Sequence, residues 1–198
     1  MYHHFRTLRV INDDRIAPLG GFPSHPHRDM EIVTHVLSGE LEHKDSLGNG
    51  EVIRAGEWQR MTAGTGVIHS EFNPSGVHST HLLQIWIMPE RKGLTPGYEQ
   101  KAFPADRGRW QVVASRDGRE GSLTIHQDAT ILNAHLEKGQ TVRYELAGGR
   151  GGWLHVATGN VTANGLTLKA GDGLAIEREP GLAVTGLDDT EVLLFDLA

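Results

Sequence analysis

Two short groups of metal-binding residue types are the part of this sequence best suited to chemistry. His25-Pro26-His27 places two imidazoles two residues apart, and His69-Ser70-Glu71 places an imidazole and a carboxylate at the same spacing. In an extended strand, side chains two residues apart point to the same face, so each pair can direct both members at one point. Three imidazoles and one carboxylate suit a single divalent transition metal.

The elements that must position these residues are short β-strands. Apolar and β-branched runs typical of strands recur around Ile53 and at residues 32–37, 82–88, 112–114, 123–126, 153–156, 166–168 and 192–195. Turn sequences such as Leu47-Gly48-Asn49-Gly50 and Asn164-Gly165 separate them. No long segment repeats apolar residues at the helical period. The sequence therefore predicts an all-β protein.

Composition excludes several classes of function. The formal net charge of -6 offers no basic surface to nucleic acid or to an anionic membrane. The chain has no cysteine, so any metal must be bound by imidazole, carboxylate or water. No apolar run reaches the roughly 18 residues of a membrane span, and the first residues lack the apolar core of a secretory signal. We expect a cytoplasmic protein with no direct nucleic-acid or membrane partner.

The two halves of the sequence resemble each other. Val36-Leu37-Ser38-Gly39-Glu40-Leu41 parallels Val156-Ala157-Thr158-Gly159-Asn160-Val161. Each is followed by a turn, an apolar strand and then Arg54-Ala55-Gly56-Glu57 or Lys169-Ala170-Gly171-Asp172. This order indicates the duplication of a β-barrel unit.

The second copy lacks the metal-binding residue types. Counted from the shared glycines, its four positions equivalent to the two groups carry Glu145, Ala147, Val184 and Gly186. We therefore predict a single metal, bound by the first half of the chain.

The segments that carry the two groups resemble a known superfamily. Residues 21–31 are similar to the first sequence motif of the cupins, and residues 64–73 to the second. With the segments 45–49, 62–66 and 84–89, they resemble the pirin family specifically, from about residue 8 to the C-terminus. The resemblance implies two tandem, jelly-roll-like cupin barrels. Residues 1–100 would form a metal-binding barrel and residues 101–198 a degenerate one.

The resemblance also implies the ligand set. His25, His27, His69 and Glu71 occupy the ligand positions of a family that binds one iron ion, and we expect Fe(II) here. The residue types alone leave Zn, Ni, Co, Mn and Cu open. Glu31 is the alternative fourth ligand, because many cupins use a carboxylate a few residues after the His-x-His pair. If Glu71 is the ligand, we expect Glu31 to hold an imidazole through a hydrogen bond.

Other residues are expected to lie outside the chemistry. We predict that five histidines in polar segments are solvated: His3, His4, His43, His78 and His81. His35 and His126 are interpreted as structural, and Trp86 and Met88 as core. The apolar side chains that flank the ligands are candidates for a substrate pocket: Phe22, Met61, Ile68 and Phe72.

Two functions follow from the resemblance. Bacterial pirins can act as quercetin 2,3-dioxygenases, and this resemblance implies an iron-dependent oxidoreductase that opens the ring of a flavonol such as quercetin with O2. Its partners would be a small planar phenol and O2, and Glu71 would also act as the catalytic base. The alternative is a non-catalytic, iron-binding protein that senses redox state and regulates a protein partner.

Overall fold

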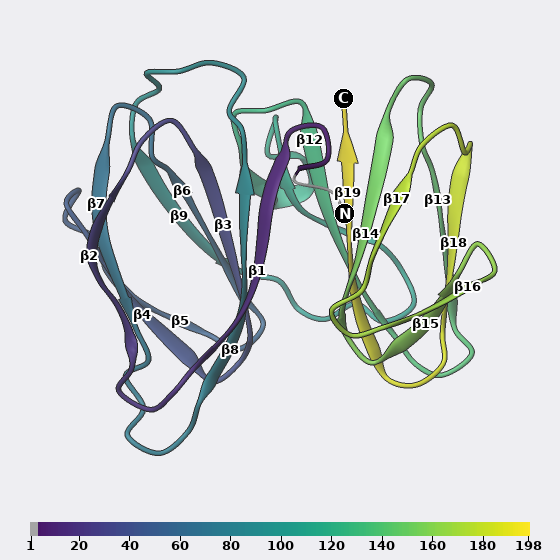
Figure 1. The fold of residues 1–198 in the computed structure, drawn as a ribbon, viewed down its shortest axis with the longest axis horizontal. Helices are drawn as coiled ribbons and strands as arrows, with labels where there is room; N and C mark the ends of the chain where they lie inside the picture. The colour runs from purple at the N-terminus through teal and green to yellow at the C-terminus, as the bar shows by residue number, and fades with distance from the viewer. Residues whose placement is uncertain (1–3) are drawn as a thin grey trace. The chain divides into compact units, whose positions relative to one another are not determined.

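The computed structural model describes residues 4–198, and these form an antiparallel β-protein (Figure 1). The all-β prediction is confirmed. Within this range no helix has the length and apolar character needed to cross a membrane. His3 lies outside the described residues.

Nine strands come from the first half of the chain. They are β1 (Leu8–Ile16), β2 (Gly21–His27), β3 (Glu31–Ser38), β4 (Glu40–Asp45), β5 (Gly50–Arg54), β6 (Glu57–Thr62), β7 (Val67–Phe72), β8 (Thr80–Ile87) and β9 (Gly97–Ala102).

The second half contributes a similar set with one short 3-10 helix, η1 (Arg119–Gly121). Its strands are β10 (Gln111–Ser115), β11 (Leu123–Thr124), β12 (Ala129–Leu136), β13 (Thr141–Glu145), β14 (Gly151–Thr158), β15 (Asn160–Ala163), β16 (Leu166–Lys169), β17 (Gly173–Ile176), β18 (Gly181–Gly186) and β19 (Thr190–Leu197).

The chain divides into two compact units. The first unit comprises Leu8–Pro104 and Leu123–Gln127, and the second comprises residues 4–7, Ala105–Ser122 and Asp128–Ala198. In the first unit, one sheet has the order β1-β8-β3-β6-β9 and the other has the order β2-β7-β4-β5 (Figure 1). The central strand β3 is buried along most of its length, from Glu31 to Val36. The two sheets therefore enclose an interior to which β3 contributes.

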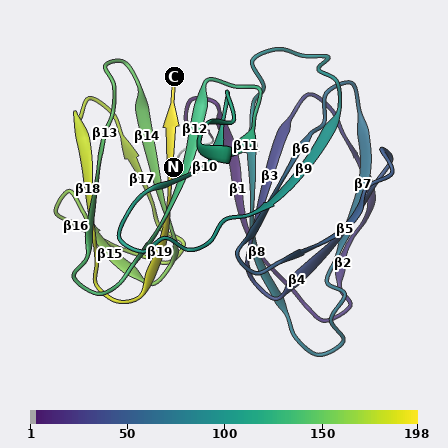
Figure 2. The same cartoon turned by 180° about the vertical axis from the view of Figure 1, so that it is seen from behind.

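The second unit repeats the order of eight of these strands (Figure 2). Strands β12-β19-β14-β17 correspond to β1-β8-β3-β6, and β13-β18-β15-β16 correspond to β2-β7-β4-β5. This equivalence agrees with the duplication that the sequence indicates. The strands of the second unit that correspond to β2 and β7 are β13 and β18, so the metal-binding positions can be compared directly.

One segment crosses from the second half of the sequence into the first unit. The strand expected over residues 123–126 is formed only at Leu123–Thr124, and the chain continues as a bent segment to Gln127. Two carboxylates of the first unit hold its backbone: Glu99 Oε2 accepts from the amide of Thr124 at 3.1 Å, and Glu31 Oε2 from that of His126 at 3.3 Å. Ile125 between them is fully buried. The sequence does not predict that this segment of the second half belongs to the first unit.

Candidate metal centre

Strand β2 lies at the edge of its sheet and pairs with β7. His25 lies opposite His69 in this pairing, and the register shifts between Phe22 and His25. Pro26 has no N–H to donate to a ladder, which an edge strand tolerates and a central strand does not. The pairing therefore brings two groups that are far apart in sequence to the same place.

Three imidazoles meet at this point. The ring centroids of His25, His27 and His69 lie 4.5 to 4.8 Å apart, in a nearly equilateral triangle. One ligating nitrogen from each ring can be chosen so that all three lie within 4.8 Å of one another. Three of the four predicted ligands are thus brought together.

The geometry of these rings fits a divalent ion. His25 Nδ1 lies 2.8 Å from the carbonyl oxygen of Pro23, which can only accept, so the proton is on Nδ1 and Nε2 is left with a lone pair. His25 Nε2 lies 3.0 Å from His69 Nε2. Two nitrogens each about 2.1 Å from an ion, at right angles, are about 3.0 Å apart. His27 Nε2 is buried and has no hydrogen-bond partner, so the set has an unsatisfied polar atom that an ion would satisfy.

Burial keeps two of these rings neutral. Desolvation, followed by the nearby His25, lowers the pKa of His27 to about 4. Desolvation and then the charges of His25, His27 and His43 lower the pKa of His69 to about 3. Metals bind the neutral form of imidazole, so both rings are ready to act as ligands at neutral pH.

Glu71 lies on the same strand as His69 and is only 2% exposed. Its oxygens accept one amide hydrogen bond each, from Gln59 Nε2 to Oε1 at 2.9 Å and from Gln84 Nε2 to Oε2 at 2.8 Å. Burial raises the pKa of this carboxyl, while the charge of His43 and both glutamine amides oppose the rise. Within 4.8 Å, Glu71 groups with His69 and His43 rather than with His25 and His27.

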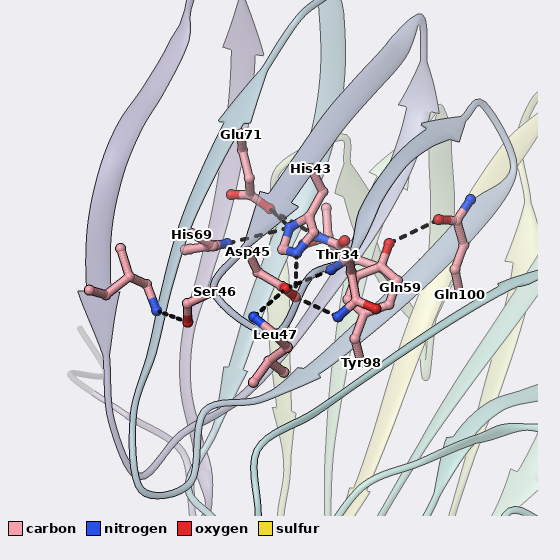
Figure 3. Close-up of polar contacts among 12 residues, drawn as sticks. Thr34, His43, Asp45, Ser46, Leu47, Gln59, His69, Glu71, Tyr98 and Gln100 are labelled. Carbon is pink, nitrogen blue, oxygen red and sulfur yellow. Dashed lines mark hydrogen bonds and ion pairs between the residues drawn. The ribbon is translucent and has the colours of Figure 1, made fainter.

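The prediction for His43 was wrong. It was expected to be solvated, yet its side chain is 0% exposed because β4 pairs with β7 and places His43 opposite Glu71. Figure 3 shows His43 among Glu71, His69 and Asp45. Its Nε2 lies 3.1 Å from Asp45 Oδ2, and its Nδ1 lies 3.5 Å from His69 Nδ1. By contrast, His35 is buried and contacts the carbonyl oxygen of Glu57, as expected of a structural strand residue.

Glu31 lies outside both groups of candidate ligands. Its Oε2 accepts a hydrogen bond from Thr62 Oγ1 at 3.0 Å, and its Oε1 lies 3.5 Å from Nδ1 of His126. The imidazole beside Glu31 is therefore that of His126, in the crossing segment, and not one of the three at the candidate centre.

A hollow of about 430 Å³ borders the site, lined by Pro26, His27, Arg28, Ser46, Gly66, Val67 and Ile68. Of the apolar residues proposed to line a pocket, Ile68 is at this hollow, whereas Met61 is buried in a core cluster with Ile32 and Val67. Trp86 packs against that cluster, as predicted, and its ring also meets His27 edge-on at 5.1 Å.

Met88, expected in the core, is 48% exposed because β8 ends at Ile87.

The equivalent place in the second unit is filled differently. Val184 lies opposite Val142 on β18 and β13, and both are buried in the apolar core of that unit. Glu145 is exposed. Among residues 4–198, both groups of three or more metal-ligating side chains lie in the first unit.

Duplicated β-barrels with a histidine cluster in the first define a two-cupin protein, and comparison with known proteins identifies its family. A family model described as Pirin matches residues 1–87, and one described as the quercetinase C-terminal cupin domain matches residues 112–197. The chain is 51% identical over 193 residues to a protein of Escherichia coli K12 named quercetin 2,3-dioxygenase, covering 98% of this chain and 83% of that one.

Solved structures give the same result. The crystal structure of YhhW from Escherichia coli superposes with a TM-score of 0.96 at 50% identity, covering 99% of this chain and 83% of that one. A structure of the bacterial pirin YhhW in complex with nickel(II) gives a TM-score of 0.93 at 50% identity, covering 98% and 83%. The chain belongs to the pirin family.

Proposed function

We propose that this protein is a metal-dependent dioxygenase of the pirin type that opens the ring of a flavonol such as quercetin with O2. The observation that carries the proposal is the triangle of imidazoles with an unpartnered, buried His27 Nε2. The name of the Escherichia coli relative, quercetin 2,3-dioxygenase, supports the substrate class.

The proposed ligands are His25, His27, His69 and Glu71, in a metal-binding domain of residues 1–100, with residues 101–198 as a domain that binds no metal. Glu71 completes the set from the strand that carries His69. The metal is Fe(II) in this proposal. Imidazole and carboxylate also accept nickel, the ion in the complex of the related pirin.

The chain's own residues prepare the site for a flat phenolic molecule. The hollow of about 430 Å³ beside His27 is within the size range of small-molecule pockets and has apolar walls at Val67 and Ile68. A bound metal supplies Lewis acidity, which lowers the cost of removing a proton from an enol or phenol. Glu71, on the strand that carries His69, accepts that proton.

Aerobic turnover of quercetin by the metal-loaded protein tests the proposal. We expect loss of the flavonol absorbance together with uptake of O2, and neither in metal-free protein nor in a His27→Ala variant. Full occupancy of the metal without product would refute the dioxygenase and favour the regulatory alternative. The proposed setting is the cytoplasm, with a small phenol and O2 as the partners.

A further inference from the structure

A buried chain of polar groups leads away from the metal side of His69. His69 Nδ1 faces His43 Nδ1 at 3.5 Å, and His43 Nε2 faces Asp45 Oδ2 at 3.1 Å. The side chains of His43 and Asp45 are both 0% exposed. Figure 3 shows the chain running from β7 through β4 to the turn that follows it.

Asp45, at the end of this series of polar groups, is held by contacts that do not involve the histidines. Besides the contact with His43, the carboxylate of Asp45 accepts hydrogen bonds from the amides of Leu47 and Asn49 and from the Asn49 side chain, at 2.8 to 3.0 Å. The ring of Tyr98 stacks on His43 with centroids 4.8 Å apart and an interplanar angle of 23°. His43 is thus held both at its edge and at its face.

With His43 neutral, the donors and acceptors in this series of polar groups have one arrangement. A carboxylate only accepts, so the proton of neutral His43 lies on Nε2 and its Nδ1 is an acceptor. His69 Nδ1 must then donate to it, which leaves the lone pair of His69 on Nε2, the atom that lies 3.0 Å from His25 Nε2. Histidine ligands usually make such a contact with a carboxylate or a carbonyl, which fixes the ring and its tautomer.

We propose that His43, anchored by Asp45, is a positioning residue that holds His69 in the tautomer and orientation needed to bind metal through Nε2. This inference rests on the proposed ligand set. The competing interpretation makes His43 itself a ligand, because its nitrogen also lies within 4.8 Å of ligating atoms of His69 and Glu71. A metal bound by both His43 and His69 would use Nδ1 of His69, on the opposite edge of the ring from Nε2.

Nitrogen spectra of the histidine rings separate the two interpretations. In Zn(II)-loaded protein labelled with 15N-histidine, we expect His69 to be protonated at Nδ1 and metal-bound at Nε2. His43 should be protonated at Nε2 and metal-free at Nδ1. A metal-bound nitrogen on His43, or Zn(II) on Nδ1 of His69, would overturn the inference.

Substitution of His43 provides a second test, by titration of Zn(II) against a chelator. His43→Phe keeps the ring against Tyr98 but removes the acceptor, and we expect Zn(II) affinity to fall about 10–100-fold. His43→Asn places an oxygen near the position of Nδ1 and should restore much of the affinity. His35→Phe, the same change at a buried histidine of the same unit, should leave it unchanged.

The two possible failures are distinguishable. If His27→Ala binds Zn(II) as tightly as the parent, the proposed ligand set is wrong. If His27→Ala loses Zn(II) but folded His43→Phe retains the parent affinity, only the positioning role is wrong. Should His43→Phe not fold, the His43→Asn titration and the parent spectra decide.

Discussion

The buried carboxylate of Glu71 depends on two amide donors, and removing one of them gives a quantitative test of the site. Gln84→Leu deletes the 2.8 Å hydrogen bond to Glu71 Oε2 and keeps a side chain of similar size. Gln84 Oε1 also accepts from Trp86 Nε1 at 3.0 Å, and this bond is lost in the variant whatever the charge of Glu71.

The size of the effect depends on whether Glu71 is ionised. A hydrogen bond to a neutral group contributes about 0.5–1.5 kcal/mol, and one to a charged group about 1.5–3 kcal/mol. Burial raises the pKa of Glu71 in the folded protein above its unfolded value. The stability that this shift contributes is therefore complete below the unfolded pKa and is lost as pH rises through the folded pKa.

Loss of the Gln84 donor raises the folded pKa further, so the variant loses more stability than the parent as pH rises. We expect the deficit in unfolding free energy to grow by about 1–1.5 kcal/mol once Glu71 is ionised.

Urea unfolding of the metal-free proteins, at intervals from about pH 5 to about pH 9, measures this deficit. Gln127→Leu is the matched control, because that amide donates to the neutral carbonyl of Met88 at 2.7 Å. Its deficit should not change with pH. If the deficit of Gln84→Leu is equally independent of pH, Glu71 is not held as a carboxylate by Gln84 and the reasoning is refuted.

Two further predictions concern the loop before β7 and the choice of the fourth ligand. Gly64 has a φ of +48°, and a Cβ there would overlap the carbonyl oxygen of Leu94, so Gly64→Ala should cost about 2–5 kcal/mol in urea unfolding. Gly56→Ala, at a φ of +83° with nothing within 4 Å, should cost only about 1–2 kcal/mol, and equal losses would contradict the overlap. Glu71→Gln should lower the bound iron measured by elemental analysis, while Glu31→Gln should leave it unchanged. The reverse order would make Glu31 the ligand.

The histidine cluster could be predicted because its signal is local. Two residues at i and i+2 on a strand share a face whatever the strand pairs with, so His25 with His27 and His69 with Glu71 needed no knowledge of the fold. Their convergence required only that the two strands be neighbours, which β2 and β7 are.

The position of His43 depends on the pairing of two strands that are distant in the sequence. Its neighbours Glu42 and Lys44 are polar, which favoured a solvated strand. His43 is two residues from the buried Leu41, however, and this spacing places both side chains on the inward face. That period-2 signal was present in the sequence. What it could not supply is the register of β4 against β7, which places His43 opposite Glu71.

The crossing segment Leu123–Gln127 had no comparable signal. Its apolar residues predicted a strand of the second half, and the docking onto Glu31 and Glu99 is made through backbone amides, which every sequence possesses.

A diffraction measurement on crystals loaded with Ni(II) tests the central claim most directly, because anomalous scattering at the nickel edge locates the ion. We predict one strong peak in the first unit, about 2.1 Å from Nε2 of His25, His27 and His69 and in contact with a carboxylate oxygen of Glu71. A nickel ion bound by other residues, a nickel ion in the second unit, or the absence of a nickel peak among these three imidazoles would contradict the account.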